Sequence, residues 1–179
     1  RVGTGSMRRR AQLLHVRPDL QVLTIRGNVD TRLRQLDEGR YDAIVLAEAG
    51  LTRLGLTDRI TQVLPKEWML PAIGQGALGL ETRADDQQTR ALVALLDEPA
   101  THAAVDAERA RLAALHGGCL APVGAWGRVV DEQLLLDAAV LDPQGRQRLE
   151  TQVAGAPQQA ASLGQQAAQQ LLDQGAAAR

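Results

Sequence analysis

The sequence changes its pattern at Asp97-Glu98-Pro99, and this change constrains the fold more than any other feature. Before it, short apolar runs alternate with helical patterns at close spacing. After it, three extended runs follow one another across short turns. Alternation predicts parallel strands joined by helices, because a parallel pair needs a crossover connection. Consecutive extended runs predict an antiparallel meander. We therefore expect an α/β doubly wound domain followed by a small α+β domain with a three-stranded antiparallel sheet.

The N-terminal part carries clear start and stop signals for its helices. Ser6 and Asn28 are favourable N-cap residues, and Pro18 cannot continue the first helix. The expected strands are one that ends near residue 3, then 21–25 and 43–47, and the expected helical segments are 7–16, 29–36, 51–54 and 58–63. The run at 43–47 is continuously apolar, which predicts a strand buried on both faces. The turns after the first two strands then lie at the edge of the sheet where α/β proteins bind ligands.

The rest of the chain supplies the crossing segment and the second unit. Residues 71–79 are rich in glycine and apolar residues, which is typical of a segment that crosses between domains, and 78–81 could add one more strand. The expected helices are 87–96, 101–116 and 158–174, and the expected strands are 123–130, 133–141 and 146–153. Asp142-Pro143-Gln144-Gly145 has the composition of a tight turn between the last two strands.

Composition excludes several classes of function. The 20 Lys and Arg residues balance 21 Asp and Glu residues, so no overall field favours nucleic acid or an anionic membrane surface. Aromatic residues make up 2% of the chain, too few for a base-stacking platform. No apolar run is long enough to span a bilayer. A single cysteine excludes an internal disulfide framework and fits a reducing compartment, so we expect a cytoplasmic protein.

Arginines stand at the starts of the first two predicted helices. Arg8 and Arg9 open the first helix, and Arg26 and Arg32 flank the start of the second. The helix macrodipole normally disfavours cations at this end, so arginines here indicate an anion held between them and the free backbone N–H groups. A guanidinium also binds a carboxylate through two parallel hydrogen bonds. A solvated arginine face is the alternative. No phosphate-binding loop motif supports a nucleotide ligand.

The only cysteine, Cys119, lies on a glycine-rich turn, Gly117-Gly118-Cys119-Leu120-Ala121-Pro122, where the helical pattern gives way to an extended one. A thiol on such a turn can be reached by a reactant, although a lone cysteine is commonly a small buried apolar residue. His15, His102 and His116 are too scattered to form a metal site with it, and no motif marks a hydrolase triad. We therefore expect no metal. At this point two alternatives stay open for Cys119: a reactive or modified thiol, and a small buried apolar residue.

Seven segments in the same order resemble one family. They are Gly3-Thr4-Gly5-Ser6-Met7-Arg8-Arg9, Arg26-Gly27-Asn28-Val29-Asp30-Thr31-Arg32-Leu33, Tyr41-Asp42-Ala43-Ile44-Val45-Leu46-Ala47, Ala49-Gly50-Leu51 with Arg53-Leu54-Gly55-Leu56, Leu70-Pro71-Ala72 with Gly74-Gln75-Gly76-Ala77, Ala107-Glu108-Arg109-Ala110, and Gly117-Gly118-Cys119 with Pro122. Together they resemble porphobilinogen deaminase, also called hydroxymethylbilane synthase. The resemblance weakens after about Leu141.

The resemblance implies a transferase of haem and tetrapyrrole biosynthesis. Such an enzyme joins four porphobilinogen molecules, with loss of ammonia, into the linear tetrapyrrole hydroxymethylbilane on a dipyrromethane primer. The resemblance implies that Cys119 carries this primer through a thioether bond. It also implies that the cofactor and substrate carboxylates are held by Thr4, Ser6, Arg8, Arg9, Arg26, Gly27 and Arg32. Arg26 and Arg32 would in addition support catalysis, and these two would bind porphobilinogen together with Arg53.

The resemblance also divides the chain and leaves a part missing. Residues 1–76 correspond to domain 2, which opens on Arg1 inside an extended pattern and is expected to be incomplete. Residues 77–96 correspond to a segment that returns to domain 1, 97–99 to a linker, and 100–179 to domain 3. The catalytic aspartate belongs to the missing part, so we expect this piece alone to be inactive, and a monomer. The alternative hypothesis is a two-lobed anion-binding module of the periplasmic-receptor type, without a covalent cofactor.

Overall fold

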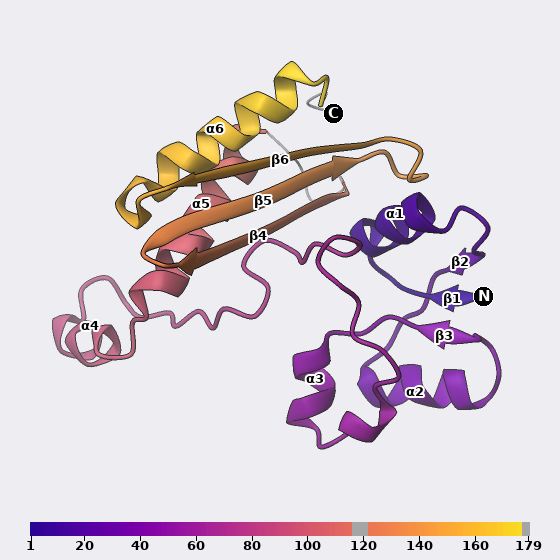
Figure 1. Ribbon diagram of the computed structural model, residues 1–179. Coiled ribbons are helices and arrows are strands. Elements are labelled where there is room, and N and C mark those ends of the chain that lie inside the picture. The colour runs from indigo at the N-terminus through magenta and orange to yellow at the C-terminus, as the bar shows by residue number, and fades with distance from the viewer. Residues whose placement is uncertain (116–121, 177–179) are drawn as a thin grey trace.

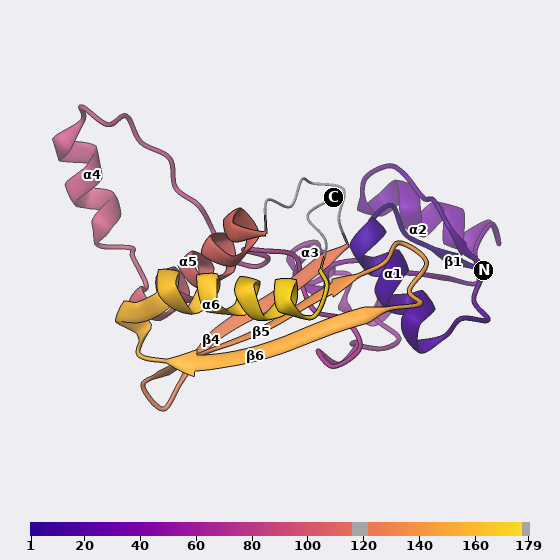
Figure 2. The same cartoon turned by 90° about the horizontal axis from the view of Figure 1, so that it is seen from above.

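The computed structural model describes residues 1–115 and 122–176. Its N-terminal part contains a parallel sheet of three two-residue strands in the order β2-β1-β3: β1 is Val2–Gly3, β2 is Val22–Leu23 and β3 is Ala43–Ile44. Helix α1 (Met7–Val16) joins β1 to β2, and α2 (Val29–Asp37) joins β2 to β3. The two helices lie on opposite sides of the sheet (Figure 1, Figure 2). This is the alternating α/β arrangement that the sequence predicts.

The predicted caps of α1 and α2 are confirmed. The side chain of Ser6 accepts a hydrogen bond from Arg9 N at 3.3 Å, and that of Asn28 accepts one from Thr31 N at 2.9 Å. Each cap satisfies one of the backbone N–H groups that a helix start leaves free. The two helix starts are therefore fixed by local chemistry.

The prediction of a doubly buried strand at 43–47 was wrong. The strand is confined to Ala43–Ile44, and Ala43 is exposed. The reason is that β3 is an edge strand of the described sheet, with β1 as its only paired neighbour there. Helix α3 (Glu48–Arg53) and the 3₁₀ turn η1 (Thr57–Arg59) follow it.

Residues 60–86 form no helix or strand, so the strand predicted at 78–81 was also wrong. Leu78 is 84% exposed and Leu80 is 60% exposed, and no described strand pairs with either residue. Helix α4 (Gln87–Ala94) comes next, capped by Asp86, whose carboxylate accepts from Thr89 N at 2.9 Å. Figure 1 shows α4 standing apart from both sheets.

The C-terminal part is an antiparallel meander covered by two helices on one face (Figure 1). Its strands are β4 (Val123–Val130), β5 (Gln133–Leu141) and β6 (Arg148–Gly155), in the order β4-β5-β6. Its helices are α5 (Pro99–Ala114) and α6 (Ala160–Asp173), the latter preceded by the 3₁₀ turn η2 (Pro157–Gln159). Helix α5 begins two residues before its predicted start, because Glu98 caps it and Pro99 takes the first helical position.

Small residues let α5 and α6 approach closely. A Cβ added at Gly164 of α6 would overlap the carbonyl oxygen of Ala107 on α5. The core between the helices and the sheet is correspondingly rich in alanine and leucine, and includes Ala104, Ala107, Ala125, Leu134, Leu136, Val153, Leu163 and Ala167. The C-terminal unit therefore has its own hydrophobic core.

The other face of this sheet meets the N-terminal unit. The crossing segment of the structure includes Leu70 as well as residues 71–79. Ala11 of α1 and Leu70 are buried against Ala139 and Leu141 of β5, with Trp126 of β4 packed beside them. Two cations lie over Trp126: the guanidinium of Arg128 at 3.9 Å from the ring centroid and the ammonium of Lys66 at 5.8 Å. In the described parts of the chain, no helix has the length and apolarity that a membrane crossing requires.

Candidate anion-binding site

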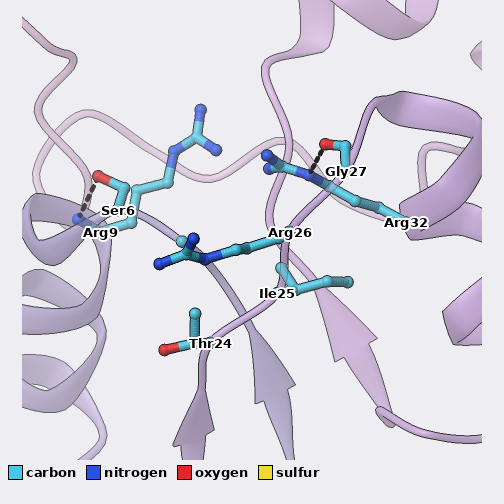
Figure 3. A pocket seen from close by; sticks show the side chains of 8 residues that line it. Ser6, Arg9, Thr24, Ile25, Arg26, Gly27 and Arg32 are labelled. Carbon is cyan, nitrogen blue, oxygen red and sulfur yellow. Dashed lines mark hydrogen bonds between the residues drawn. The ribbon is translucent and has the colours of Figure 1, made fainter.

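An open pocket of about 500 Å³ lies where the turns after β1 and β2 face each other. The residues that line it are Gly5, Ser6, Arg9, Thr24, Ile25, Arg26, Gly27 and Arg32 (Figure 3). Ser6 is the N-cap of α1, and Gly27 directly precedes Asn28, the N-cap of α2. The pocket is therefore built from the starts of two helices, at the edge of the sheet where ligands are expected.

Close backbone approach shapes the pocket. A Cβ at Gly5 would lie 2.8 Å from the carbonyl oxygen of Ile25, so only glycine lets the two turns come this near. Gly27 has a φ of 108°, a conformation that residues with a Cβ rarely adopt. The glycines of both turns thus bring the two helix starts together.

Three guanidinium groups point into this pocket from different positions in the chain (Figure 3). Arg9 Nη1 donates to the carbonyl oxygen of Val45 at 2.9 Å, and Arg32 Nε donates to the carbonyl oxygen of Gly27 at 2.8 Å. Arg26 is exposed and extends across the mouth of the pocket between them. No aspartate or glutamate is among the lining residues, so the positive charge is not neutralised from within.

The electrostatics of the pocket favour an anion. Burial lowers the pKa of Arg9, and the neighbouring Arg32 guanidinium lowers it further. Like charges held this close repel, and an anion placed between them removes the repulsion. Hydrogen bonds between ionised donors and acceptors are also the stronger kind, especially where a carboxylate meets an arginine fork. The arrangement suits a ligand with more than one carboxylate.

The structure brings together five of the predicted ligand-holding residues: Ser6, Arg9, Arg26, Gly27 and Arg32. Thr4 is buried beneath them and accepts a hydrogen bond from Ser6 N at 3.2 Å, which supports the turn from below. Arg53 is exposed at the end of α3 and does not line the pocket. Cys119, the predicted attachment point, lies outside the described residues.

Arg8 turns toward the crossing segment. Its Nη1 donates to the carbonyl oxygen of Leu70, and its Nη2 lies 3.5 Å from Gln75 Oε1. Burial, together with the neighbouring Arg9, lowers the pKa of Arg8 to about 10. In this arrangement Arg8 joins α1 to the crossing segment, while Arg9 faces the pocket.

Sequence reasoning missed three lining residues: Gly5, in the turn after β1, and Thr24 and Ile25. The last two are informative. Both follow β2 directly and precede the turn at Arg26, so the rule that ligands meet the carboxyl ends of parallel strands identifies their position. Among residues 1–115 and 122–176, no three His, Cys, Asp or Glu side chains gather as metal ligands would.

A parallel α/β unit with arginine-lined helix starts is typical of anion-binding proteins, and comparison with known proteins gives the family of this chain. Residues 1–91 match the family model described as "Porphobilinogen deaminase, dipyromethane cofactor binding domain", and residues 102–173 match "Porphobilinogen deaminase, C-terminal domain". The chain belongs to the porphobilinogen deaminase family.

Two relatives named porphobilinogen deaminase align with almost the whole chain. The protein of Desulforudis audaxviator is 52% identical over 175 residues, and that of Syntrophobacter fumaroxidans is 47% identical over 176 residues. Each alignment covers 98% of this chain. The chain spans 57% of the length of each of these relatives.

Proposed function

We propose that this chain is the larger part of a porphobilinogen deaminase. The complete enzyme would join four porphobilinogen molecules, with loss of ammonia, into hydroxymethylbilane. The observation that carries the proposal is the pocket of Arg9, Arg26 and Arg32, which lies within the part of the chain that matches the cofactor-binding family model. Porphobilinogen and its oligomers carry an acetate and a propionate on every pyrrole, so an arginine-lined pocket without acidic residues suits them.

The same pocket fits the dipyrromethane cofactor. Three guanidinium groups converge there, and no acidic side chain competes with the cofactor's carboxylates. When bound, the dipyrromethane supplies the pyrrole onto which the product chain is built. Arg9 and Arg32 would hold its carboxylates through charge-assisted hydrogen bonds, and Ser6 would add a hydroxyl at the helix start. Cys119 would anchor it through a thioether, and Arg8 and Thr4 would complete the set. Arg53 would assist substrate binding from α3.

We further infer that residues 1–76 are part of a larger doubly wound domain of the periplasmic-binding-protein kind. The parallel order β2-β1-β3, with helices on both sides, supports this inference. Residues 77–96 would return to a further domain. Leu92 is 61% exposed, Leu95 81% and Leu96 71%, and leucines this exposed favour a covering partner. A cytoplasmic monomer with a small-molecule substrate completes the proposal.

The test is to compare the chain alone with the chain joined to the N-terminal part of the Desulforudis relative. The joined protein should consume porphobilinogen and carry a mass addition of two pyrroles that reacts with an aldehyde reagent for pyrroles. The addition should be absent from the Cys119→Ser variant. The chain alone should show no turnover, because it spans 57% of the length of each named relative and we expect the catalytic aspartate of the family to lie in the part it does not span.

Two results would contradict the proposal. Full turnover by the chain alone would show that no further region is needed. A bare Cys119 thiol in an active joined protein would remove the covalent cofactor. Reversible anion binding by a joined protein with a bare thiol and no turnover would favour the receptor-type alternative, with which the pocket and the α/β layout are also compatible.

A further inference from the structure

We propose that Gln12 is a positioning residue that locks the helix of the anion pocket to the crossing segment, so that the pocket and the C-terminal sheet keep one relative orientation. Its positioning role rests on the proposed function, because that function requires a group anchored after α5 to reach the pocket. The coupling itself rests on contacts among described residues alone.

Gln12 is fully buried on α1, in the helix that also carries Arg9. Its carboxamide pairs with the backbone of Leu70 in both directions: Leu70 N donates to Oε1 at 2.8 Å, and Nε2 donates to the carbonyl oxygen of Leu70 at 3.1 Å. A side-chain amide combines an acceptor and a donor in this planar arrangement without carrying charge. The pair reproduces the contact that a neighbouring strand would make.

Leu70 is in turn fixed to the C-terminal sheet. Its side chain is buried against Ala139 and Leu141 of β5, and the next residue accepts a backbone hydrogen bond from Ala125 of β4 at 3.1 Å. A Cβ at Gly124 would lie 2.7 Å from the Cβ of Leu70, so the segment lies directly on β4. One residue of the crossing segment therefore links α1 to the sheet.

Two further contacts hold the same arrangement. Glu108 of α5 accepts from Gly74 N at 2.6 Å and from Gly127 N at 2.7 Å, which ties the crossing segment to both α5 and β4. The turn between β5 and β6 meets α1 directly, with His15 Nδ1 at 2.9 Å from the carbonyl oxygen of Gly145. Gln12 adds to these contacts. Among the side chains that the structure describes, it alone pairs with both the N–H and the carbonyl group of one residue of the crossing segment.

Fixed orientation has a consequence for the proposed reaction. A covalently anchored chain that grows during synthesis needs room, and that room would have to come from parts other than the joint between α1 and β5. Gln12 would act through Arg9 and the α1 helix start, since it does not line the pocket. A loss of Gln12 should loosen the orientation of the two units while it leaves the residues of the pocket in place.

The experiment measures a distance across the joint by electron spin resonance between two nitroxide labels. The labels are placed on exposed sites, at Arg34→Cys on α2 and Gln166→Cys on α6, in a Cys119→Ser background of this chain. Gln12→Met keeps the length of the side chain and removes its hydrogen bonds. Gln12→Glu replaces the amide donor with a second carboxylate oxygen and adds a negative charge at a buried position. Both should replace the single dominant distance with a broad distribution. Leu33→Ala, which removes core packing within α2, should lower stability and leave the distribution narrow.

The outcomes separate the coupling from the proposed function. A distribution in the Gln12→Met variant as narrow as in the unmodified protein would overturn the inference. A distribution broadened equally by Leu33→Ala would also overturn it, since loosening would then follow from lost stability. A broadened distribution specific to Gln12, in a protein whose joined form neither carries a pyrrole addition nor consumes porphobilinogen, would keep the coupling and reject the proposed function.

Discussion

Arg9 and Arg32 face the same pocket from the first turns of two different helices, and the pKa of Arg9 is lowered by burial and by the charge of Arg32. The two residues are distant in the sequence, and the parallel pairing of β1 with β2 brings their helix starts together. The two like charges repel each other. This repulsion favours a ligand of negative charge in the pocket.

Removing either guanidinium should weaken anion binding. Hydrogen bonds to charged groups contribute about 1.5–3 kcal/mol, so Arg32→Met should reduce the affinity for citrate by about ten- to hundredfold. Arg10→Met is the matched control, because Arg10 donates to the carbonyl oxygen of Val22 and does not line the pocket. Calorimetric titration at low salt measures the effect, and added salt should weaken binding to the unmodified protein. Equal affinities for the two variants would contradict the assignment of the pocket.

Gly145→Ala should destabilise the joint between α1 and the meander. Gly145 has a φ of 72°, and a Cβ there would lie 2.6 Å from the carbonyl oxygen of Ala11 and from His15 N. Strain and overlap together should lower the free energy of unfolding by about 3 kcal/mol. Gly39 has a similar φ of 71° with open space around it, so Gly39→Ala should lower the free energy of unfolding by only about 1 kcal/mol. Urea unfolding of both variants measures the two losses in free energy of unfolding. Equal losses would show that the close contact of Gly145 with α1 does not add to the destabilisation.

Arg111→Met should stabilise the protein. Arg111 is fully buried on α5, its guanidinium nitrogens have no hydrogen-bond partner among the described residues, and burial lowers its pKa to about 10. Replacing such a charge with an apolar side chain of similar length should raise the free energy of unfolding by about 2 kcal/mol. Arg109→Met, at an exposed position of the same helix, should change it by less than about 0.5 kcal/mol. A destabilised Arg111→Met variant would indicate a partner for this guanidinium.

Glu108 should make stability depend on pH in a defined direction. Burial raises its pKa above the ordinary value of 4.5, against the opposing effect of hydrogen bonds from Gly127 and Gly74. Between the raised pKa of Glu108 in the folded protein and the ordinary value of 4.5 in the unfolded chain, the folded protein binds more protons. The free energy of unfolding therefore rises as the pH falls through this window. The stability difference between the unmodified protein and Glu108→Gln should therefore grow in favour of the former as the pH approaches 4.5. A difference that is constant from pH 8 to pH 4.5 would contradict the raised pKa.

The sequence predicted the helix starts well because they depend on local signals. It predicted the strands less well because a strand depends on pairing with residues distant in the sequence. The start of α1 follows from Ser6 and that of α2 from Asn28, because capping is a contact between near neighbours in sequence. The strand predicted at 78–81 has an apolar pattern, but a strand also needs a partner, and no described strand supplies one. Strand β6 begins two residues later than predicted, since Asp142 accepts from both Gln144 N and Gln147 N and lengthens the turn.

The sequence predicted where the candidate site lies better than it predicted which residues line the pocket. Arginines beside two helix starts indicated an anion pocket, and five predicted residues do line one. Sequence could not separate Arg8 from Arg9, because consecutive helical residues point about 100° apart and only the packing around them decides which faces the pocket. Leu70 and Gln75 of the crossing segment contact Arg8, and these contacts depend on the tertiary fold.

The ammonium of Lys66 over Trp126 gives the protein a built-in reporter. Lys66 is the only lysine in the chain, so reductive methylation would modify this side chain and the N-terminal amine alone. The indole of Trp126 packs against the cluster of Ala11, Leu70, Ala139 and Leu141. Its emission would register any chemical change or displacement there once Trp68 is replaced by phenylalanine. Movement between the two units could then be followed in solution without an added dye.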